Sequence, residues 1–120
     1  MLILFDHSTP RALRRYLRGH TVHVAEQLGW HRLSNGLLIA RAEASGYELL
    51  ISADQSIQYQ QNLSARNIAI LALMKNNWGL IRPQVDDIVT AVNRIQPGDY
   101  VEIDFPMPPL DPYGSNEGNP

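Results

Sequence analysis

Two aspartates, Asp6 and Asp54, are the residues of this chain whose placement is best suited to chemistry. Each follows a short apolar run, residues 1–5 for Asp6 and residues 49–53 for Asp54. Such runs, rich in branched side chains and followed by helix-like segments, are typical of buried parallel strands. Open α/β sheets bind ligands at the carboxyl ends of their strands, and two carboxylates there can share a divalent metal. A strand-end aspartate is more commonly a helix N-cap or turn former, and each one taken singly fits that role better.

The rest of the chain alternates between apolar runs and helix-length segments. The pattern predicts strands at 2–5, 21–25, 48–52, 68–73 and 100–105, the last an edge strand, and helices at 10–17, 36–45 and 82–95. A short helix with a loop is expected in the polar segment 55–63. Strands separated by helix-length segments form right-handed βαβ units around a largely parallel sheet. The predicted fold class is therefore α/β, a three-layer α/β/α sandwich whose mostly parallel central sheet has four to five strands.

Local signals set the expected helix boundaries. Thr9 is the expected N-cap of the first helix, with Pro10 at its first position. Ser34 or Asn35 can cap the helix over 36–45. The apolar stripe over 85–92 serves either the core or a dimer contact, and we favour the core. Residues 1–105 form the single predicted domain, and the Pro- and Gly-rich residues 106–120 are expected to be a disordered tail.

The composition limits the classes of protein that remain. A chain of 120 residues with 44% hydrophobic content can bury one core. It has no cysteine, which excludes disulfides, thiolate metal sites and a cysteine nucleophile. The apolar opening is too short for a signal peptide or a membrane span. We expect a soluble, cytoplasmic protein.

The net charge of -2 conceals an uneven distribution. The chain through Gly46 carries six arginines against three acids, and the remainder carries four basic against nine acidic residues. Arginines at positions 11, 14, 15 and 18 follow α-helical spacing and would share one face. That face could hold phosphates or an acidic partner, but a solvated face opposite Leu13 and Leu17 is the interpretation we favour. An acidic protein overall is not expected to be a tight, nonspecific nucleic-acid binder.

Several common catalytic motifs are missing from the sequence. It holds no GxGxxG, GxxxxGK[ST], HExxH or GxSxG, so dinucleotide, P-loop, zincin and hydrolase-elbow sites lose their main support. A phosphate-receiver domain is also disfavoured, because it needs an acidic pair after the first strand and a lysine after the last. Here His7 follows Asp6, and the only lysine is Lys75. Among the histidines only His7 has a possible site role, and an ordinary loop histidine is the simpler interpretation.

A family resemblance rests on three strings and the NNW that follows them: LFDHSTPRALRRYLRGHTV, LSNGLLIARAEASGYELLISADQS and YQQNLSARNIAILAL. Together they resemble the DUF5615 group of small PIN-like proteins over roughly the first hundred residues. The positions that match in order are Asp6, Pro10, Gly19-His20, Asn35-Gly36, Ala42-Glu43, Asp54-Gln55 and Tyr59-Gln60-Gln61-Asn62. The resemblance implies a PIN-like α/β/α sandwich. Active PIN proteins are Mg²⁺- or Mn²⁺-dependent ribonucleases, and many are toxins of toxin–antitoxin pairs.

The resemblance implies roles for individual residues. Asp6 and Asp54 match the acids that bind the metal, which lowers the pKa of a water and stabilises charge on the phosphate. PIN sites usually have three or four acids, and His7 and Asn35 stand here where further acids are common. Glu43 is better explained as a solvent-exposed helix residue. Supporting or substrate-binding roles are expected for His7, Asn35, Gln55, Tyr59, Gln61 and Asn62.

Two hypotheses follow from the sequence. The first is a metal-dependent endoribonuclease, with Asp6 and Asp54 as catalytic metal ligands and an antitoxin-like protein as partner. The alternative, favoured by the missing third acid, is a catalytically inactive PIN-like module that binds another protein. We expect a homodimer and no membrane association. Trp30 and Trp78 could stack on bases, although packed loop aromatics or dimer contacts are more common.

Overall fold

A computed structural model of the chain describes residues 1–59, 63 and 65–107. Its centre is a five-stranded sheet in which every neighbouring pair is parallel. The strands are β1 (Leu2–Phe5), β2 (Thr21–Val24), β3 (Leu49–Ser52), β4 (Ala69–Leu73) and β5 (Tyr100–Ile103), in the spatial order β2-β1-β3-β4-β5. The prediction of an α/β fold with a parallel sheet is confirmed, and β5 is an edge strand as expected.

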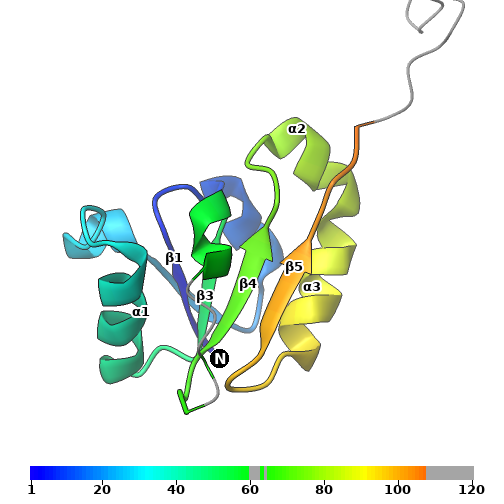
Figure 1. The fold of residues 1–120 in the computed structure, drawn as a ribbon. Coiled ribbons are helices and arrows are strands. Elements are labelled where there is room, and N and C mark those ends of the chain that lie inside the picture. The colour runs from blue at the N-terminus through cyan, green and yellow to red at the C-terminus, as the bar shows by residue number, and fades with distance from the viewer. Residues whose placement is uncertain (60–62, 64, 108–120) are drawn as a thin grey trace, which may run out of the picture.

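Helices cover both faces of the sheet, as Figure 1 shows with α1 (Asn35–Ala44) on one side and α3 (Val85–Arg94) on the other. The first face carries the 3₁₀ helix η1 (Arg11–Tyr16), α2 (Trp78–Ile81) and α3. The second carries α1 and the 3₁₀ helix η3 (Gln55–Tyr59). Two short 3₁₀ segments, η2 (Ala25–Leu28) and η4 (Arg82–Gln84), complete the elements.

Alternation along the strands produces the two cores. In β1, Ile3 and Phe5 point to one face and Leu4 to the other, and all three are fully buried. The strand β3 behaves in the same way, since successive side chains of a strand point to opposite faces. The apolar stripe of α3 (Val85, Ile88 and Val92) is buried in the first core, which confirms its predicted place.

Two helix predictions need correction, and the structure decides between the two caps predicted for a third helix. The first helix is a six-residue 3₁₀ helix, capped by Pro10 rather than Thr9, and Pro10 makes no side-chain capping bond. The predicted helix over 82–95 is preceded by α2 and begins as the separate 3₁₀ segment η4. At α1 the cap is Ser34, whose side chain accepts a hydrogen bond from the amide of Leu37 at 3.4 Å. Asn35 is the first residue of that helix, so its side chain is available for another contact.

The four arginines near η1 do not form the predicted α-helical stripe. All four are exposed, but side chains of a 3₁₀ helix repeat every three residues, so Arg11 and Arg14 align while Arg15 does not. Arg11 forms an ion pair with Glu26, and Arg18 lies beyond the end of η1.

The strand order defines where a ligand crevice is expected. From β1 the chain moves outward to β2, and it then returns across the sheet to β3, on the other side of β1. In doubly wound sheets the crevice lies at the carboxyl ends of the two strands that flank this reversal. Here those strands are β1 and β3, which precede Asp6 and Asp54 respectively.

Two further expectations concern the ends of the chain and the membrane. Residues 108–120, which make up most of the tail predicted to be disordered, lie outside the described residues. None of the helices in the described ranges combines the length and apolar character that a bilayer span requires.

Candidate functional site

Asp6 lies at the carboxyl end of β1, beside the end of β3. Its side chain is only 2% exposed. The carboxylate Oδ1 accepts hydrogen bonds from the Ser8 amide at 3.0 Å and the Ser8 hydroxyl at 2.6 Å. Oδ2 accepts one from the Ser52 hydroxyl at 2.5 Å. Asp6 is therefore a buried carboxylate whose two oxygens are both paired within the chain.

Thr9 adds a third hydroxyl to this cluster. Its Oγ1 lies 3.0 Å from Oδ1 of Asp6 and 2.6 Å from the carbonyl oxygen of Ile51. A hydroxyl has one proton to donate, and the shorter distance favours donation to Ile51. This contact fastens the chain after β1 onto β3, and it replaces the capping role predicted for Thr9.

Two serine hydroxyls extend the network to the residues after β3. The Ser52 hydroxyl accepts from the Asp54 amide at 3.1 Å while it donates to Asp6. The Ser8 hydroxyl accepts from the Ala53 amide at 3.0 Å while it also donates to Asp6. The structure thus joins Asp6 and the backbone of Asp54 through one intervening side chain.

Asp54 differs from Asp6 in being partly exposed. Its Oδ1 accepts from the Ser56 amide at 2.9 Å and the Ser56 hydroxyl at 2.8 Å. Its Oδ2 accepts from Nδ2 of Asn35 at 3.4 Å. These hydrogen bonds, those of Ser56 foremost, and the charge of His7 lower the pKa of Asp54, although partial burial opposes them. Asp54 is consequently an ionised carboxylate at neutral pH, next to solvent.

Of the six residues predicted to support the site, the structure describes the side chains of three: His7, Asn35 and Gln55. Asn35 contacts both Asp54 and the Ser56 hydroxyl, the latter at 2.9 Å, and His7 is exposed and near enough for its charge to act on Asp54. The structure therefore brings these two predicted residues to Asp54. For the others, Gln61 and Asn62 lie outside the described residues, as does the side chain of Tyr59.

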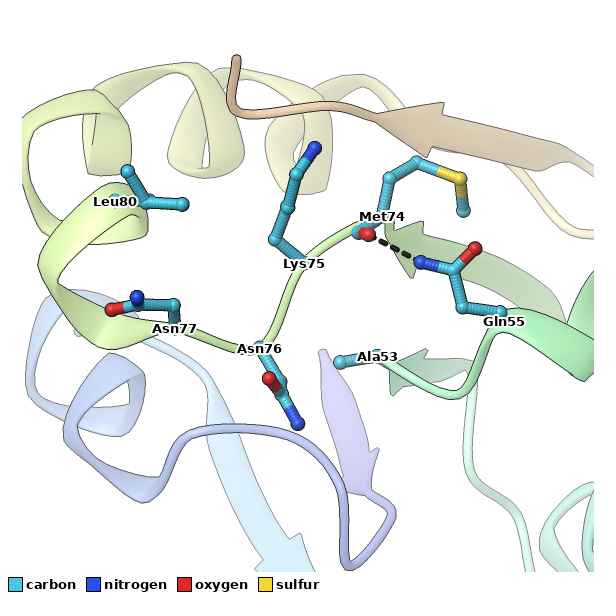
Figure 2. Close-up of a pocket in the computed structure, with 7 residues that line it drawn as sticks. All are labelled: Ala53, Gln55, Met74, Lys75, Asn76, Asn77 and Leu80. Atoms are coloured by element: carbon cyan, nitrogen blue, oxygen red, sulfur yellow. Dashed lines mark hydrogen bonds between the residues drawn. The ribbon is translucent and has the colours of Figure 1, made fainter. Parts of the chain in front are cut away.

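A hollow of about 330 Å³, shown in Figure 2, adjoins Ala53 and Gln55, the residues on either side of Asp54 in the chain, and Asp54 itself does not line it. Its lining residues follow β3 and β4 or belong to the start of α2: Ala53, Gln55, Met74, Lys75, Asn76, Asn77 and Leu80. Gln55 donates from Nε2 to the carbonyl oxygen of Met74 at 2.5 Å, which bridges the ends of the two strands. Lys75 is turned toward Asp104, 2.6 Å from its Oδ1. Apart from Lys75, the polar side chains that line the hollow are thus neutral amides.

Glu43 is not part of this site. Its carboxylate pairs with Arg66 at 2.7 Å and accepts from the amide of Asn67 at 2.6 Å. Asn67 precedes β4, so Glu43 lies at the amino edge of the sheet, opposite to Asp6 and Asp54. The amide of Asn67 chiefly lowers the pKa of Glu43, with help from Arg66. The sequence favours a solvent-exposed helix residue at position 43, but in the structure Glu43 has a structural role, because it holds Arg66 and the amide of Asn67.

The two tryptophans have different surroundings. Trp30 packs edge-on against Tyr47, with ring centroids 6.0 Å apart, and Arg41 lies 5.7 Å from the Trp30 ring. It is a packed aromatic, in agreement with the simpler interpretation. Trp78, the first residue of α2, instead pairs with the partly exposed Tyr16.

The chemistry of the donors can be tested against the expected metal. In the described part of the chain, no three His, Asp or Glu side chains are grouped so that they could hold an ion. Mg²⁺ commonly takes one or two protein carboxylates and keeps several waters. Oδ2 of Asp54 fits such a ligand, since its contact with Asn35 is long. Asp6 fits a supporting position better, because hydroxyl groups already occupy both of its oxygens.

Sequence reasoning missed the serines and the hollow. Ser52 is the one polar residue of an otherwise apolar strand. A polar residue in such a strand is expected to be buried, as Ser52 is, and a buried hydroxyl needs a hydrogen-bond partner. This position was therefore the signal in the sequence. Asn76 and Asn77 line the hollow, and the sequence marks them only as part of the NNW string of the family resemblance, with no role assigned. Comparisons of the chain with protein-family models, with curated proteins and with solved structures found no match.

Proposed function

We propose that this protein is a metal-dependent ribonuclease of the PIN-like type, acting as the toxin of a two-protein pair. The observation that carries the proposal is the arrangement of Asp6 and Asp54 at the reversal point of the sheet, joined through Ser52. Asp54 offers an ionised, partly exposed carboxylate. The hollow lined by its chain neighbours Ala53 and Gln55 also contains amide side chains, which are donors and acceptors for a base or a phosphate.

Each residue has a distinct part in this proposal. Asp54 would hold Mg²⁺ or Mn²⁺ through Oδ2, and Asp6 would fix the Asp54 backbone through Ser52. When bound, such an ion lowers the pKa of a water and offsets charge on the attacked phosphate. His7 is exposed beside Asp54 and can donate a hydrogen bond to a phosphate oxygen. Direct ligation by Asp6 would require the hydroxyls of Ser8 and Ser52 to turn away from it.

The test measures metal binding and RNA cleavage together. Mn²⁺ is titrated into the purified wild type and into Asp54→Asn by calorimetry, and both are assayed against single-stranded RNA. We expect the wild type to bind Mn²⁺ and cleave, and Asp54→Asn to lose both. Asp86→Asn, an exposed acid of α3, is the matched control and should behave as wild type. A wild type that neither binds Mn²⁺ nor cleaves RNA would refute the nuclease.

A second candidate function has its own support. Both oxygens of Asp6 are occupied by donors of the same chain, which is how a purely structural carboxylate is held. On this account the protein is an inactive PIN-like module that binds an antitoxin-like protein. Absence of Mn²⁺ binding, combined with a stable complex between this chain and the product of the adjacent gene, would favour the module.

A further inference from the structure

A second hollow adjoins an aromatic pair on the first face of the sheet. Tyr16 of η1 and Trp78 of α2 lie with ring centroids 5.9 Å apart and planes tilted by 45°. The hollow has a volume of about 520 Å³ and is lined by Tyr16, Gly79, Arg82 and Pro83. Tyr16 is 38% exposed although it is a large aromatic side chain. Its ring therefore presents surface to the hollow instead of being enclosed by the core.

Exposed arginines accompany this aromatic pair: Arg82 lines the same hollow, and Arg14 lies with Tyr16 on η1. Arg14, Arg15, Arg18 and Arg82 are all exposed, and none of them takes part in an ion pair within the described ranges. The segment 7–25 that contains η1 has four arginines and no acid. The nearest acids in sequence to Arg82 are Asp86 and Asp87, in the first turn of α3. The segment that contains η1 therefore has a local excess of positive charge.

The aromatic pair and the candidate site are both next to α2. Helix α2 separates the two hollows: Asn77 and Leu80 line the one that adjoins Gln55, which Figure 2 shows, and Gly79 lines the other. Trp78 lies between these residues in the chain. A ligand that crosses α2 would therefore contact both hollows.

We propose that Tyr16, Trp78, Arg14 and Arg82 form a binding surface for single-stranded RNA. A base stacks on the exposed Tyr16 ring, and arginines on η1 and η4 contact the phosphates on either side. Stacking on aromatic side chains combined with backbone contacts from basic residues is how single strands are bound. In a duplex the base faces are already stacked on one another, so the aromatic pair specifies an unpaired strand. The choice of RNA rests on the proposed function.

The test uses binding without cleavage. A fluorescein-labelled oligouridine of about 12 nucleotides, within the range of typical single-strand sites, is titrated in EDTA and followed by anisotropy. We expect Tyr16→Leu to weaken binding by about fivefold or more, which corresponds to the stacking of one base. Tyr16→Phe keeps the ring and should bind within about twofold of the wild type. Equal losses in the two variants would overturn the stacking role.

The charge contribution is measured in the same assay. Arg14→Gln and Arg82→Gln should each reduce the slope of log affinity against log salt by about 0.7, the value for one phosphate of a single strand. Arg94→Gln, an exposed arginine in the last turn of α3, is the matched control and should leave the slope unchanged. An equal effect of all three variants on the slope would overturn the proposal. Displacement of the RNA by polyglutamate, added at the same concentration of negative charges as the RNA, would also overturn it.

This experiment separates the two proposals. RNA binding in EDTA that depends on Tyr16, with no cleavage when Mn²⁺ is added, would refute the nuclease and support the surface. Cleavage that is unaffected by Tyr16→Leu and Arg82→Gln would support the nuclease and overturn the surface.

Discussion

Ser52 joins the two aspartates: its hydroxyl donates to Oδ2 of Asp6 at 2.5 Å and accepts from the amide of Asp54 at 3.1 Å. Ser52 is fully buried, so Ser52→Ala would leave a buried carboxylate oxygen and a backbone amide without this partner. We expect a loss of about 1–3 kcal/mol in the free energy of unfolding, the usual cost of unsatisfied buried groups. Urea denaturation measures it. Ser45→Ala, at the exposed end of α1, should change stability much less, and equal effects would contradict the role of Ser52.

The two aspartates should respond differently to the same substitution. Asp6→Asn replaces an acceptor with an NH₂ group that faces hydroxyl donors, whereas Asp54→Asn changes a partly exposed side chain. We expect Asp6→Asn to lower the melting temperature by about 5–15 °C, as a loss of a few kcal/mol does in a domain of this size. Asp54→Asn should lower it far less. Differential scanning calorimetry compares the two, and the reverse order would show that Asp6 is not the structural acid.

The lowered pKa of Asp54 links its hydrogen bonds to the pH dependence of stability. Because the folded pKa lies below the ordinary value of 3.8, Asp54 stabilises the fold fully above that value. The contribution is lost as the pH falls through the folded pKa. The wild type should therefore be more stable than Asp54→Asn at pH 7, and the difference should shrink below pH 4. Urea unfolding at a series of pH values measures this, and a difference that is constant with pH would argue against the assignment.

The partners of Asp54 should contribute in a definite order. The Ser56 amide is the largest cause of its lowered pKa, and the Ser56 hydroxyl, which Ser56→Ala removes, comes next, ahead of Asn35 and then His7. We expect Ser56→Ala to raise the pKa of Asp54 more than Asn35→Ala does, and His7→Gln to raise it least. Carboxyl chemical shifts followed by NMR during a pH titration give each value. A larger shift in His7→Gln than in Ser56→Ala would indicate that charge, rather than hydrogen bonding, holds Asp54 ionised.

Capping of α1 provides a separate prediction. Ser34, and not Asn35, is the N-cap, so Ser34→Ala should cost about 0.5–1 kcal/mol of stability, in the lower part of the usual range because the capping bond is long. Thermal unfolding followed by circular dichroism measures the change. Ser34→Asp, which retains a capping oxygen, should restore the stability, and failure to do so would mean that the cap contributes little.

The strands could be predicted from the sequence because each one is a compact apolar run. The runs around Leu4, Leu50 and Ile70 are buried on both faces of a parallel sheet, so their sequences are continuous and easily recognised. The strand order could not be predicted, because local patterns do not specify which strands pair. Pairing of β1 with β3 is a long-range contact that joins segments with no signal for each other.

Local signals also misled where tertiary contacts compete with them. Thr9 before Pro10 has the sequence of a helix cap, but its hydroxyl contacts Ile51 on β3 instead. Asn35 could be placed at a helix start, but its contact with Asp54 depends on how α1 packs beside η3. The sequence predicts Asp6 and Asp54 at one edge of the sheet, because carboxyl ends of parallel strands share an edge, and the structure has them there, joined through Ser52. Whether they bind a metal stays a prediction.

The bond between Ser52 and Asp6 spans 46 residues of chain, and this has a consequence for the order of folding. The segment that contains β1 and β2 cannot complete the pairing of Asp6 by itself, since one partner arrives only with β3. Contacts of high sequence separation form after the chain has closed a long loop, which slows folding. The carboxyl edge of the sheet should therefore be assembled late, and during refolding its amides should gain protection from hydrogen exchange after those within α1.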